Sequence, residues 1–156
     1  MSVQTSYNFY TDKGVAGGLY DLGHHVVDTF INEDADGVLK FGMGVGRTNG
    51  NLVSVFNSGT DTDFVGVVVN DFSTEMDMRG RLALKSDVAV GVLTHGKVWA
   101  RIKPGITPKY GDDLYIIYEG EHAGCFTNAT EAEAILLKGR FVGTKGTGNV
   151  APIELF

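Results

Sequence analysis

Residues 88–103, VAVGVLTHGKVWARIK, decide the fold class of this chain. Apolar residues recur there at every second position, namely Val88, Val90, Val92, Val98, Ala100 and Ile102. Successive side chains of a β-strand point to opposite faces, so this period of two predicts two strands that share one apolar face. The opposite face carries Trp99, Arg101 and Lys103. We expect His95-Gly96 to be the turn of a hairpin between these strands, because glycine adopts positive φ without steric cost.

The rest of the chain repeats this pattern of short apolar segments separated by turns. Further segments with a strand pattern are 25–31, 38–46, 52–56, 64–69, 82–84, 114–118, 134–142 and 151–156. Asn, Asp, Gly, Ser and Thr separate them, and 22 glycines against 3 prolines are typical of tight turns and bulges. We predict an all-β (mainly β) fold, a compact β-barrel or sandwich of short strands. At most one short helix is expected near 128–136, where Thr130 and Glu133 have the spacing of a capping box.

Two glycine-containing segments look like ligand-binding loops but lack residues that such loops need. Residues 32–37, NEDADG, place oxygen ligands at alternate positions, but Met43 stands where an EF-hand loop needs its bidentate glutamate. Residues 42–46, GMGVG, do not complete the G-x-G-x-x-G pattern of a dinucleotide site. We therefore expect the first segment to be a turn, and the second to belong to a strand that packs closely against another backbone.

Length and charge limit the partners that this chain can have. Its 156 residues fit one domain, and its formal net charge is −6. Nucleic acid and anionic membranes both require clustered Lys and Arg, so neither partner is expected. The sequence also shows no signal-peptide pattern and no apolar segment of membrane-spanning length. We divide the chain into an N-terminal arm, residues 1–14, and a single β-rich domain, residues 15–156.

Residue types that carry chemistry are present but are not concentrated. His24 and His25 would face opposite sides of a strand, and His95 and His122 lie at expected turns, so no metal site is predicted. Cys125 is the only cysteine and is expected to be inert. The carboxylates expected to be solvated turn residues include Asp61, Asp63, Asp71, Asp77, Asp112 and Asp113. We therefore predict no catalytic residue, no metal, no cofactor and no enzymatic activity.

Several segments occur in an order that resembles a known family. They are Gly17–Asp21, Val38–Val45, Phe64–Val67, Val92–Val98, Gly111–Tyr115 and Ala151–Leu155. Over most of its length the chain resembles the small head-decoration, or structural cement, proteins of tailed bacteriophages. The resemblance implies a β-barrel-like fold, a trimer in many members, and binding to the outside of the assembled shell. It implies no catalytic residues.

The resemblance also sets the expected partners and location. The partners would be the major capsid protein and further copies of this chain, in a homotrimer that bridges neighbouring capsid subunits and stabilises the head. The protein would be made in the host cytoplasm and lie on the capsid exterior, where packaged DNA does not repel an acidic chain. Interface residues are expected where a lone domain would not place apolar or aromatic side chains: Tyr7, Phe9, Tyr10, Phe72, Trp99 and Phe156. The alternative for each is ordinary packing within the subunit.

Three other functions fit parts of the sequence. One is another structural component of the virion, such as a head or tail fibre. Another is a trimeric β-barrel nucleotide hydrolase, of which Arg47-Thr48 and the glycine-rich residues 143–148 give only faint traces. The third is a non-viral barrel that binds carbohydrate or peptide. Binding to assembled shells would separate the cement function from all three.

Overall fold

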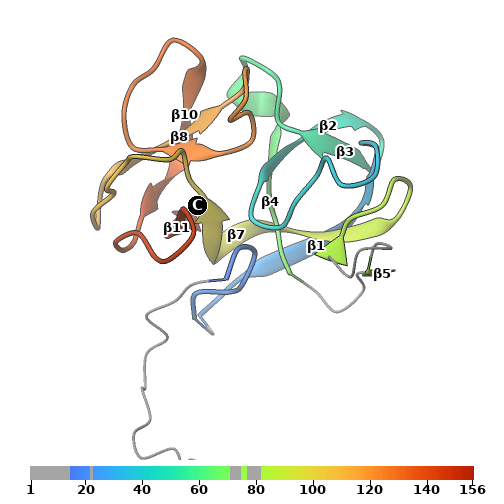
Figure 1. Cartoon of the computed structure of the whole chain (residues 1–156), viewed down its shortest axis with the longest axis horizontal. Coiled ribbons are helices and arrows are strands. Elements are labelled where there is room, and N and C mark those ends of the chain that lie inside the picture. Colours follow the sequence, from blue (N-terminus) through green and yellow to red (C-terminus); the bar gives the residue numbers. More distant parts are fainter. Residues whose placement is uncertain (1–14, 22, 71–74, 77–81) are drawn as a thin grey trace, which may run out of the picture.

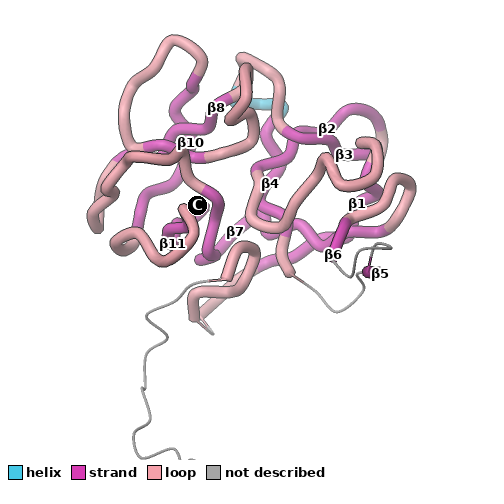
Figure 2. The backbone as a smooth tube through the Cα atoms, in the orientation of Figure 1, coloured by secondary structure: helices cyan, strands magenta, loops and turns pink. Residues whose placement is uncertain are grey.

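The computed structural model describes residues 15–21, 23–70, 75–76 and 82–156, and strands account for nearly all of the regular structure. The predicted all-β fold is confirmed. Within the described residues the helical structure is a single 3-10 turn, η1 (Asp61–Asp63), drawn in cyan in Figure 2. The strands are β1 (Val26–Asn32), β2 (Gly44–Asn49), β3 (Leu52–Val55), β4 (Phe64–Val68), β5 (Glu75–Met76), β6 (Leu82–Ala83), β7 (Ala89–Arg101), β8 (Asp113–Ile117), β9 (Phe126–Thr127), β10 (Ala134–Phe141) and β11 (Val150–Leu155).

Five strands close into a barrel, which we call the first barrel. Its order is β1-β3-β2-β4-β7, and β7 pairs again with β1 to complete the circle. The β1–β3 pair is parallel, and the other four pairs are antiparallel. Closure leaves no free strand edge around this barrel, which removes a common route to aggregation.

The remaining strands form a second, less complete circle, which we call the second ring. Its order is β7-β11-β10-β8-β9, all antiparallel. A single isolated bridge between Ile102 and Phe126 returns from β9 to the end of β7. The first barrel and the second ring therefore lie side by side and share β7, which crosses from one to the other (Figure 1).

The turn predicted at His95-Gly96 is wrong, because β7 continues through these residues. Before Gly96 the strand pairs with β1 and β4, and from Gly96 onward it pairs with β11. Gly96 has φ +121, and a Cβ there would lie only 2.7 Å from the Cβ of His25. Glycine is therefore needed at the point where β7 passes from the first barrel into the second ring. The two halves of the strand pair with different strands on either side of it.

The predicted alternation is confirmed along β7, but Val88, which precedes the strand, is 36% exposed. Val90 and Val92 are buried in the first barrel, whereas Val98, Ala100 and Ile102 are buried in the second ring. The intervening residues Trp99, Arg101 and Lys103 are only half-buried. One period-two pattern thus supplies apolar side chains to two successive interiors.

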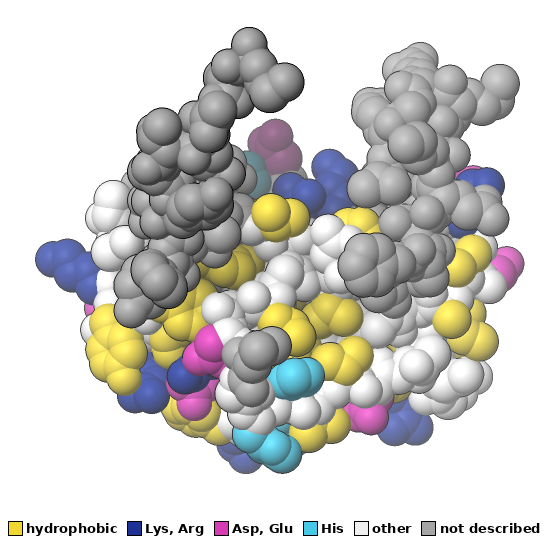
Figure 3. All heavy atoms as spheres, turned by 90° about the horizontal axis from the view of Figure 1, so that it is seen from below, with side chains coloured by type: hydrophobic (Ala, Val, Ile, Leu, Met, Phe, Trp, Pro, Cys, Tyr) yellow, Lys and Arg dark blue, Asp and Glu magenta, His cyan; other side chains and the backbone are white. Residues whose placement is uncertain are grey.

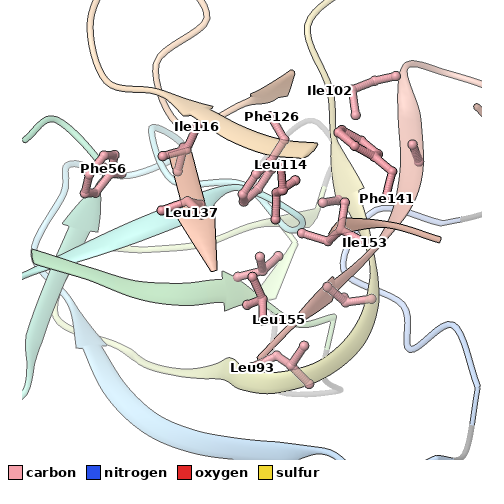
Figure 4. Packing of buried hydrophobic residues seen from close by; sticks show 14 of the residues in the cluster. Phe56, Leu93, Ile102, Leu114, Ile116, Phe126, Leu137, Phe141, Ile153 and Leu155 are labelled. Atoms are coloured by element: carbon pink, nitrogen blue, oxygen red, sulfur yellow. The ribbon is translucent and has the colours of Figure 1, made fainter. Parts of the chain in front are cut away.

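Two hydrophobic clusters fill these interiors. The smaller cluster is mainly aliphatic and includes Val45, Val53 and Leu39. The larger cluster extends across the boundary between the two circles, because it joins Phe56 to Phe126 and to residues of β10 and β11 (Figure 4). Half-buried Phe64 makes edge contacts with Phe56 and Phe126, with ring centroids 5.7 and 6.3 Å away.

Two other predicted elements differ from the structure. The strand expected over 38–46 begins only at Gly44, and the residues before it form turns and loop. The optional helix near 128–136 is not formed, since bends and a turn lead directly into β10. There the amide of Tyr118 donates to the carbonyl of Glu133, and Ala134 pairs with Ile117. This ladder with β8 outweighs the weak helix propensity of a short segment.

Candidate functional site

The histidines near the crossing of β7 do not form a ligand set. A Cβ on Gly96 would meet His25 and the carbonyl of His24, and His95 pairs with Val26. The side chains are exposed, and histidine atoms are visible near one edge of the face in Figure 3. The ring of His25 hydrogen-bonds the carbonyl of Gly23 at 2.9 Å. Across the residues that the structure describes, no three His, Cys, Asp or Glu side chains are placed to hold a metal ion.

The calcium-like loop is a turn, as predicted, and its oxygens bind backbone amides. Asn32 is fully buried, donates to the carbonyl of Lys85 and accepts from the amide of Asp34. The carboxylates of Asp34 and Asp36 accept the amides of Val55 and Ser86, each at 2.8 Å. These side chains hold the loop against the first barrel.

Cys125 and the acidic turns offer no activated group. Burial raises the pKa of the Cys125 thiol, which favours the unreactive protonated form. Asp63 accepts from the hydroxyl of Ser58 at 2.6 Å, and Asp112 accepts from Asn128 and from the amide of Lys109. Asp71 and Asp77 lie outside the described residues. Asp63 and Asp112 thus hydrogen-bond to groups close to them in space, as aspartate commonly does in turns, whereas Asp113 is the first residue of β8 and not a turn residue as predicted.

The first exposed aromatic surface surrounds Trp99 on β7. The ring of Tyr20, which is 41 % exposed, packs against the half-buried Trp99 ring with centroids 5.7 Å apart. The backbone of Trp99 accepts from the amide of Gly17 and donates to the carbonyl of Gly18. Lys97 forms an ion pair with Asp21 at 3.2 Å beside them. Residues 17–21 are therefore fastened along the edge of β7, directly after the predicted arm.

The second exposed surface lies on β10 and β11 and has an arginine between two rings. The guanidinium carbon of Arg140 lies 5.1 Å from the ring centre of Tyr110 and 5.9 Å from that of Phe156. Tyr110 is 66 % exposed and Phe156 is 59 % exposed. We call these three residues the Arg140 cluster. Aromatic residues and arginine dominate the energetically important positions of protein interfaces.

Backbone hydrogen bonds hold the two chain segments that carry the rings of the Arg140 cluster. The amide of Phe156 donates to the carbonyl of Lys138, which extends the β10–β11 ladder by one residue. Two backbone hydrogen bonds hold the end of the loop that carries Tyr110. The amide of Gly111 donates to the carbonyl of Phe141, and the amide of Phe141 donates to the carbonyl of Asp112. Two chain segments distant in sequence are thus hydrogen-bonded to β10 near Arg140.

A cleft of about 280 Å³ borders the cluster between the first barrel and the second ring. Its apolar lining comes from Phe64, Leu137, Leu155 and Phe156, among others. Polar groups, including Lys138, also line it. Phe156 belongs both to the cleft and to the Arg140 cluster, so the two features form one continuous surface.

A comparison with family models identifies the class of this protein. Residues 3–156 match the model of the phage family described as structural cement protein (E217 gp24/Pam3 gp6). The chain belongs to this family. The cement proteins are structural, so this chain is a structural component of a phage capsid and not an enzyme. That result is against the nucleotide-hydrolase alternative and confirms the resemblance seen in the sequence.

Solved structures support the fold of this cement protein. A chain in the structure "The capsid of Myoviridae Phage XM1" superposes with a TM-score of 0.74 at 15% sequence identity. The match covers 99% of this chain and 98% of the other. At this identity the comparison establishes the shared fold. Comparison with curated proteins gave no match.

The structure places only part of the predicted interface set of this cement protein. Tyr7, Phe9, Tyr10 and Phe72 lie outside the described residues. Trp99 is half-buried against Tyr20, whereas Phe156 is exposed at the end of β11. The roles of all six residues as contacts remain predictions.

Sequence reasoning missed Tyr110 and Arg140. Neither residue stands out in the sequence, because Tyr110 precedes an ordinary turn and Arg140 belongs to an alternating strand. The meeting of a loop, β10 and the last residue of the chain creates the cluster. The one local signal was Phe156, an aromatic residue that follows the apolar pattern of the last strand.

Proposed function

We propose that this cement protein binds the exterior of the assembled phage head and stabilises it, as a homotrimer that bridges neighbouring subunits of the major capsid protein. The match to the structural cement family over residues 3–156 is the observation that carries this proposal. The net charge of −6 supports the exterior position, because packaged DNA would repel an acidic chain. The exposed aromatic surfaces around Trp99 and Arg140 offer the kind of contacts that a bridging protein needs.

The stabilisation follows from linkage. A protein that binds the assembled shell and not the free subunit favours assembly by RT ln(1 + [L]/Kd). A trimer adds to this effect, since its second and third contacts form within one complex at high effective concentration. Individual contacts can therefore be weak while the bound trimer is stable.

The chain divides into parts with different roles in this proposal. Residues 15–156 form the domain that covers the shell, and residues 1–14 form an arm that docks on a neighbour through Tyr7, Phe9 and Tyr10. Aromatic side chains suit such docking because they bury a large apolar area and keep a polar group for hydrogen bonding. The described chain begins at Val15, which is 62% exposed, next to the segment fastened along β7.

Sedimentation with purified shells tests the main proposal. The protein should co-sediment with heads assembled from the major capsid protein alone, and the bound amount should saturate. The covered heads should melt at a higher temperature than bare heads. Free capsid subunits should not bind it. Protein that stays in the supernatant at saturating concentration would contradict the cement function proposed for the exterior.

Two further measurements test the exterior position and the trimer separately. Protease treatment of intact covered heads should digest the protein, because the proposed position is outside, and protection would place it inside. Native mass spectrometry should give three times the chain mass, and a monomer would contradict the trimer while leaving shell binding in place.

Deletion of residues 1–14 should weaken shell binding or trimer formation. Unchanged binding and mass would show that the arm has neither role.

A further inference from the structure

The side chains of Tyr110 and Phe156 are exposed, and the backbone segments that carry them are hydrogen-bonded to β10. Both residues expose more than half of their surface to solvent. The backbone of Phe156 and the backbone that follows Tyr110 are hydrogen-bonded to β10. Leu136, which lies on β10 before Arg140, is also 55% exposed. Rigid aromatic anchors lose little conformational entropy when they become buried, so they contribute strongly to binding. The exposed apolar and aromatic side chains of this surface are of the kind found at protein interfaces.

The guanidinium of Arg140 retains unused hydrogen-bonding capacity. Its Nη2 donates to Glu154 across the neighbouring strand, but the distance is 3.3 Å. Its Nε is buried, and none of the described residues accepts a hydrogen bond from it. A guanidinium has five N–H donors in a planar fork that matches a carboxylate in two-point contact. A small shift of this side chain toward a partner carboxylate would satisfy donors that the isolated chain leaves weakly bonded.

The charge around the cluster permits the approach of an anionic group. Residues 26–95 contain ten acidic and five basic residues, whereas residues 96–156 contain seven of each. In the register of the sheet, Arg140 lies opposite Glu154 on β11 and Asp113 on β8, and Glu154 lies opposite Lys97. Lys138 is exposed on the same strand as Arg140. The excess negative charge of the chain thus belongs to the first barrel and its loops, and the second ring is neutral.

We propose that the Arg140 cluster is the shell-facing contact of this protein and that it docks on a carboxylate set in an apolar site of the shell protein. Tyr110 and Phe156 would fill the apolar part, and Arg140 with Lys138 would bind the carboxylate. The acidic first barrel then faces solvent. This inference rests on the proposed function, since it specifies which surface meets the shell and which partner chemistry it recognises.

Shell-binding measurements with point variants test this proposal. Tyr110→Ala and Arg140→Glu should each weaken binding to purified shells by about tenfold or more, as is typical of interface hot spots. Arg140→Lys should also weaken it several-fold, because lysine keeps the charge but loses the planar fork and the ring stacking. The matched controls are Arg47→Glu and Val38→Ala, which change an exposed charge and an exposed apolar side chain in the first-barrel half and should leave affinity within about twofold.

Thermal melting shows whether each variant is folded before its binding is interpreted. Should Arg140→Glu fail to fold, Tyr110→Ala decides the question, because that side chain is largely exposed on a loop. Native mass spectrometry of the same variants is the second readout. If the variants lose the trimer in the absence of shells, the cluster is a contact between copies and the proposal is overturned.

Chemical coupling tests the partner chemistry directly. A carbodiimide joins an amine to a carboxylate without a spacer, so it should couple Lys138 to an Asp or Glu of the shell protein. Lys138→Arg has no primary amine to couple, so it should lose this cross-link. Wild-type affinity in Tyr110→Ala and Arg140→Lys, or coupling only through lysines of the first barrel, would overturn the inference while the cement function stands. Failure of the wild-type protein to bind shells would overturn both.

Discussion

The first barrel and the second ring share β7 but differ in how they are closed and filled. Backbone ladders join all neighbouring strands of the first barrel, whereas one bridge between Ile102 and Phe126 closes the second ring. The first barrel has a mainly aliphatic interior and an acidic sequence, and the second ring has Phe126 and Phe141 in its interior and a neutral sequence. The exposed Tyr110 and Phe156 also belong to the second ring. The first barrel thus resembles a closed structural support, and the second ring presents the exposed aromatic surface.

Close backbone approach limits the space for a side chain at one position of the first barrel. Gly66 on β4 faces β7 so closely that an added Cβ would overlap the carbonyl group of Leu93. By contrast, an added Cβ on Gly44 would meet the side-chain methyl of Ile116 in the second ring, which has some freedom to move. The first contact is backbone against backbone, and the second is backbone against side chain. These two glycines of the first barrel should therefore differ in their tolerance of substitution. Gly139 in the second ring should behave like Gly66, because an added Cβ there would lie 2.5 Å from the carbonyl oxygen of Glu154.

The largest expected effect is at the backbone contact in the first barrel. Gly66→Ala should lower the free energy of unfolding by about 4 kcal/mol or more, because β4 must move away from β7 and break the ladder. The variant is expected to be unfolded or insoluble, and circular dichroism with urea denaturation measures this.

Gly37→Ala is the matched control for that prediction. Its φ is +79, but a Cβ there would meet no atom within 4 Å, so only backbone strain of about 1–2 kcal/mol is added. Gly66 has no positive φ, so equal losses for the two variants would show that the close approach of β4 to β7 costs no more than the backbone strain at Gly37.

Removal of core side chains should have the next largest effect and tests whether the two circles unfold together. Phe126→Ala in the second ring should cost about 3–5 kcal/mol, and Val53→Ala in the first barrel should cost roughly 2 kcal/mol. Because one hydrophobic cluster extends into both circles and β7 is shared, we expect a single transition in each case. Fluorescence of Trp99 reports the second ring, and far-UV circular dichroism reports the whole molecule.

Coincident fluorescence and circular dichroism curves would support the prediction that residues 15–156 act as one domain. Two separate transitions, in which Phe126→Ala shifts the fluorescence curve and only one of two steps in the circular dichroism curve, would contradict it. In that case the single bridge at Ile102 would mark a boundary between independently stable parts.

The sequence predicted the strands well because their signal is local. Alternation along β7 and the short apolar segments elsewhere located most strands to within a few residues. The errors occurred where tertiary pairing decided the outcome. His95-Gly96 has the composition of a turn, yet β1, β4 and β11 hold it in one strand. Residues near 128–136 have helix-forming residues, yet β8 draws them into a ladder.

The candidate surface was less accessible to prediction than the fold. Phe156 was found because an exposed terminal aromatic is unusual at the level of sequence. Arg140 and Tyr110 were not found, because their neighbours come from separate segments and no spacing rule links them. Interfaces of this kind depend on which side chains the fold leaves exposed together, so the structure was needed to define the Arg140 cluster.

The smallest expected effect concerns a carboxylate that holds the Tyr110 loop in the second ring. Hydrogen bonds from the side chain of Asn128 and the amide of Lys109 lower the pKa of Asp112 below its ordinary value of 3.8. A depressed pKa in the folded state adds stability above the unfolded-state pKa, and this stability is lost as the pH falls through the folded-state pKa. Asp112→Asn should therefore lower the melting temperature at pH 7 by a few degrees at most, about 2–4 °C.

The difference in melting temperature between wild type and Asp112→Asn should narrow as the pH falls below about 4, since the wild-type carboxyl then becomes protonated as well. Asp113→Asn is the control, because it removes an exposed carboxylate from the next position. A difference that stays constant down to pH 2 would show that shape, and not charge, explains the effect of Asp112. If both variants behave alike, the Tyr110 loop does not depend on this carboxylate, and the backbone hydrogen bonds of Gly111 and Phe141 alone hold it in place.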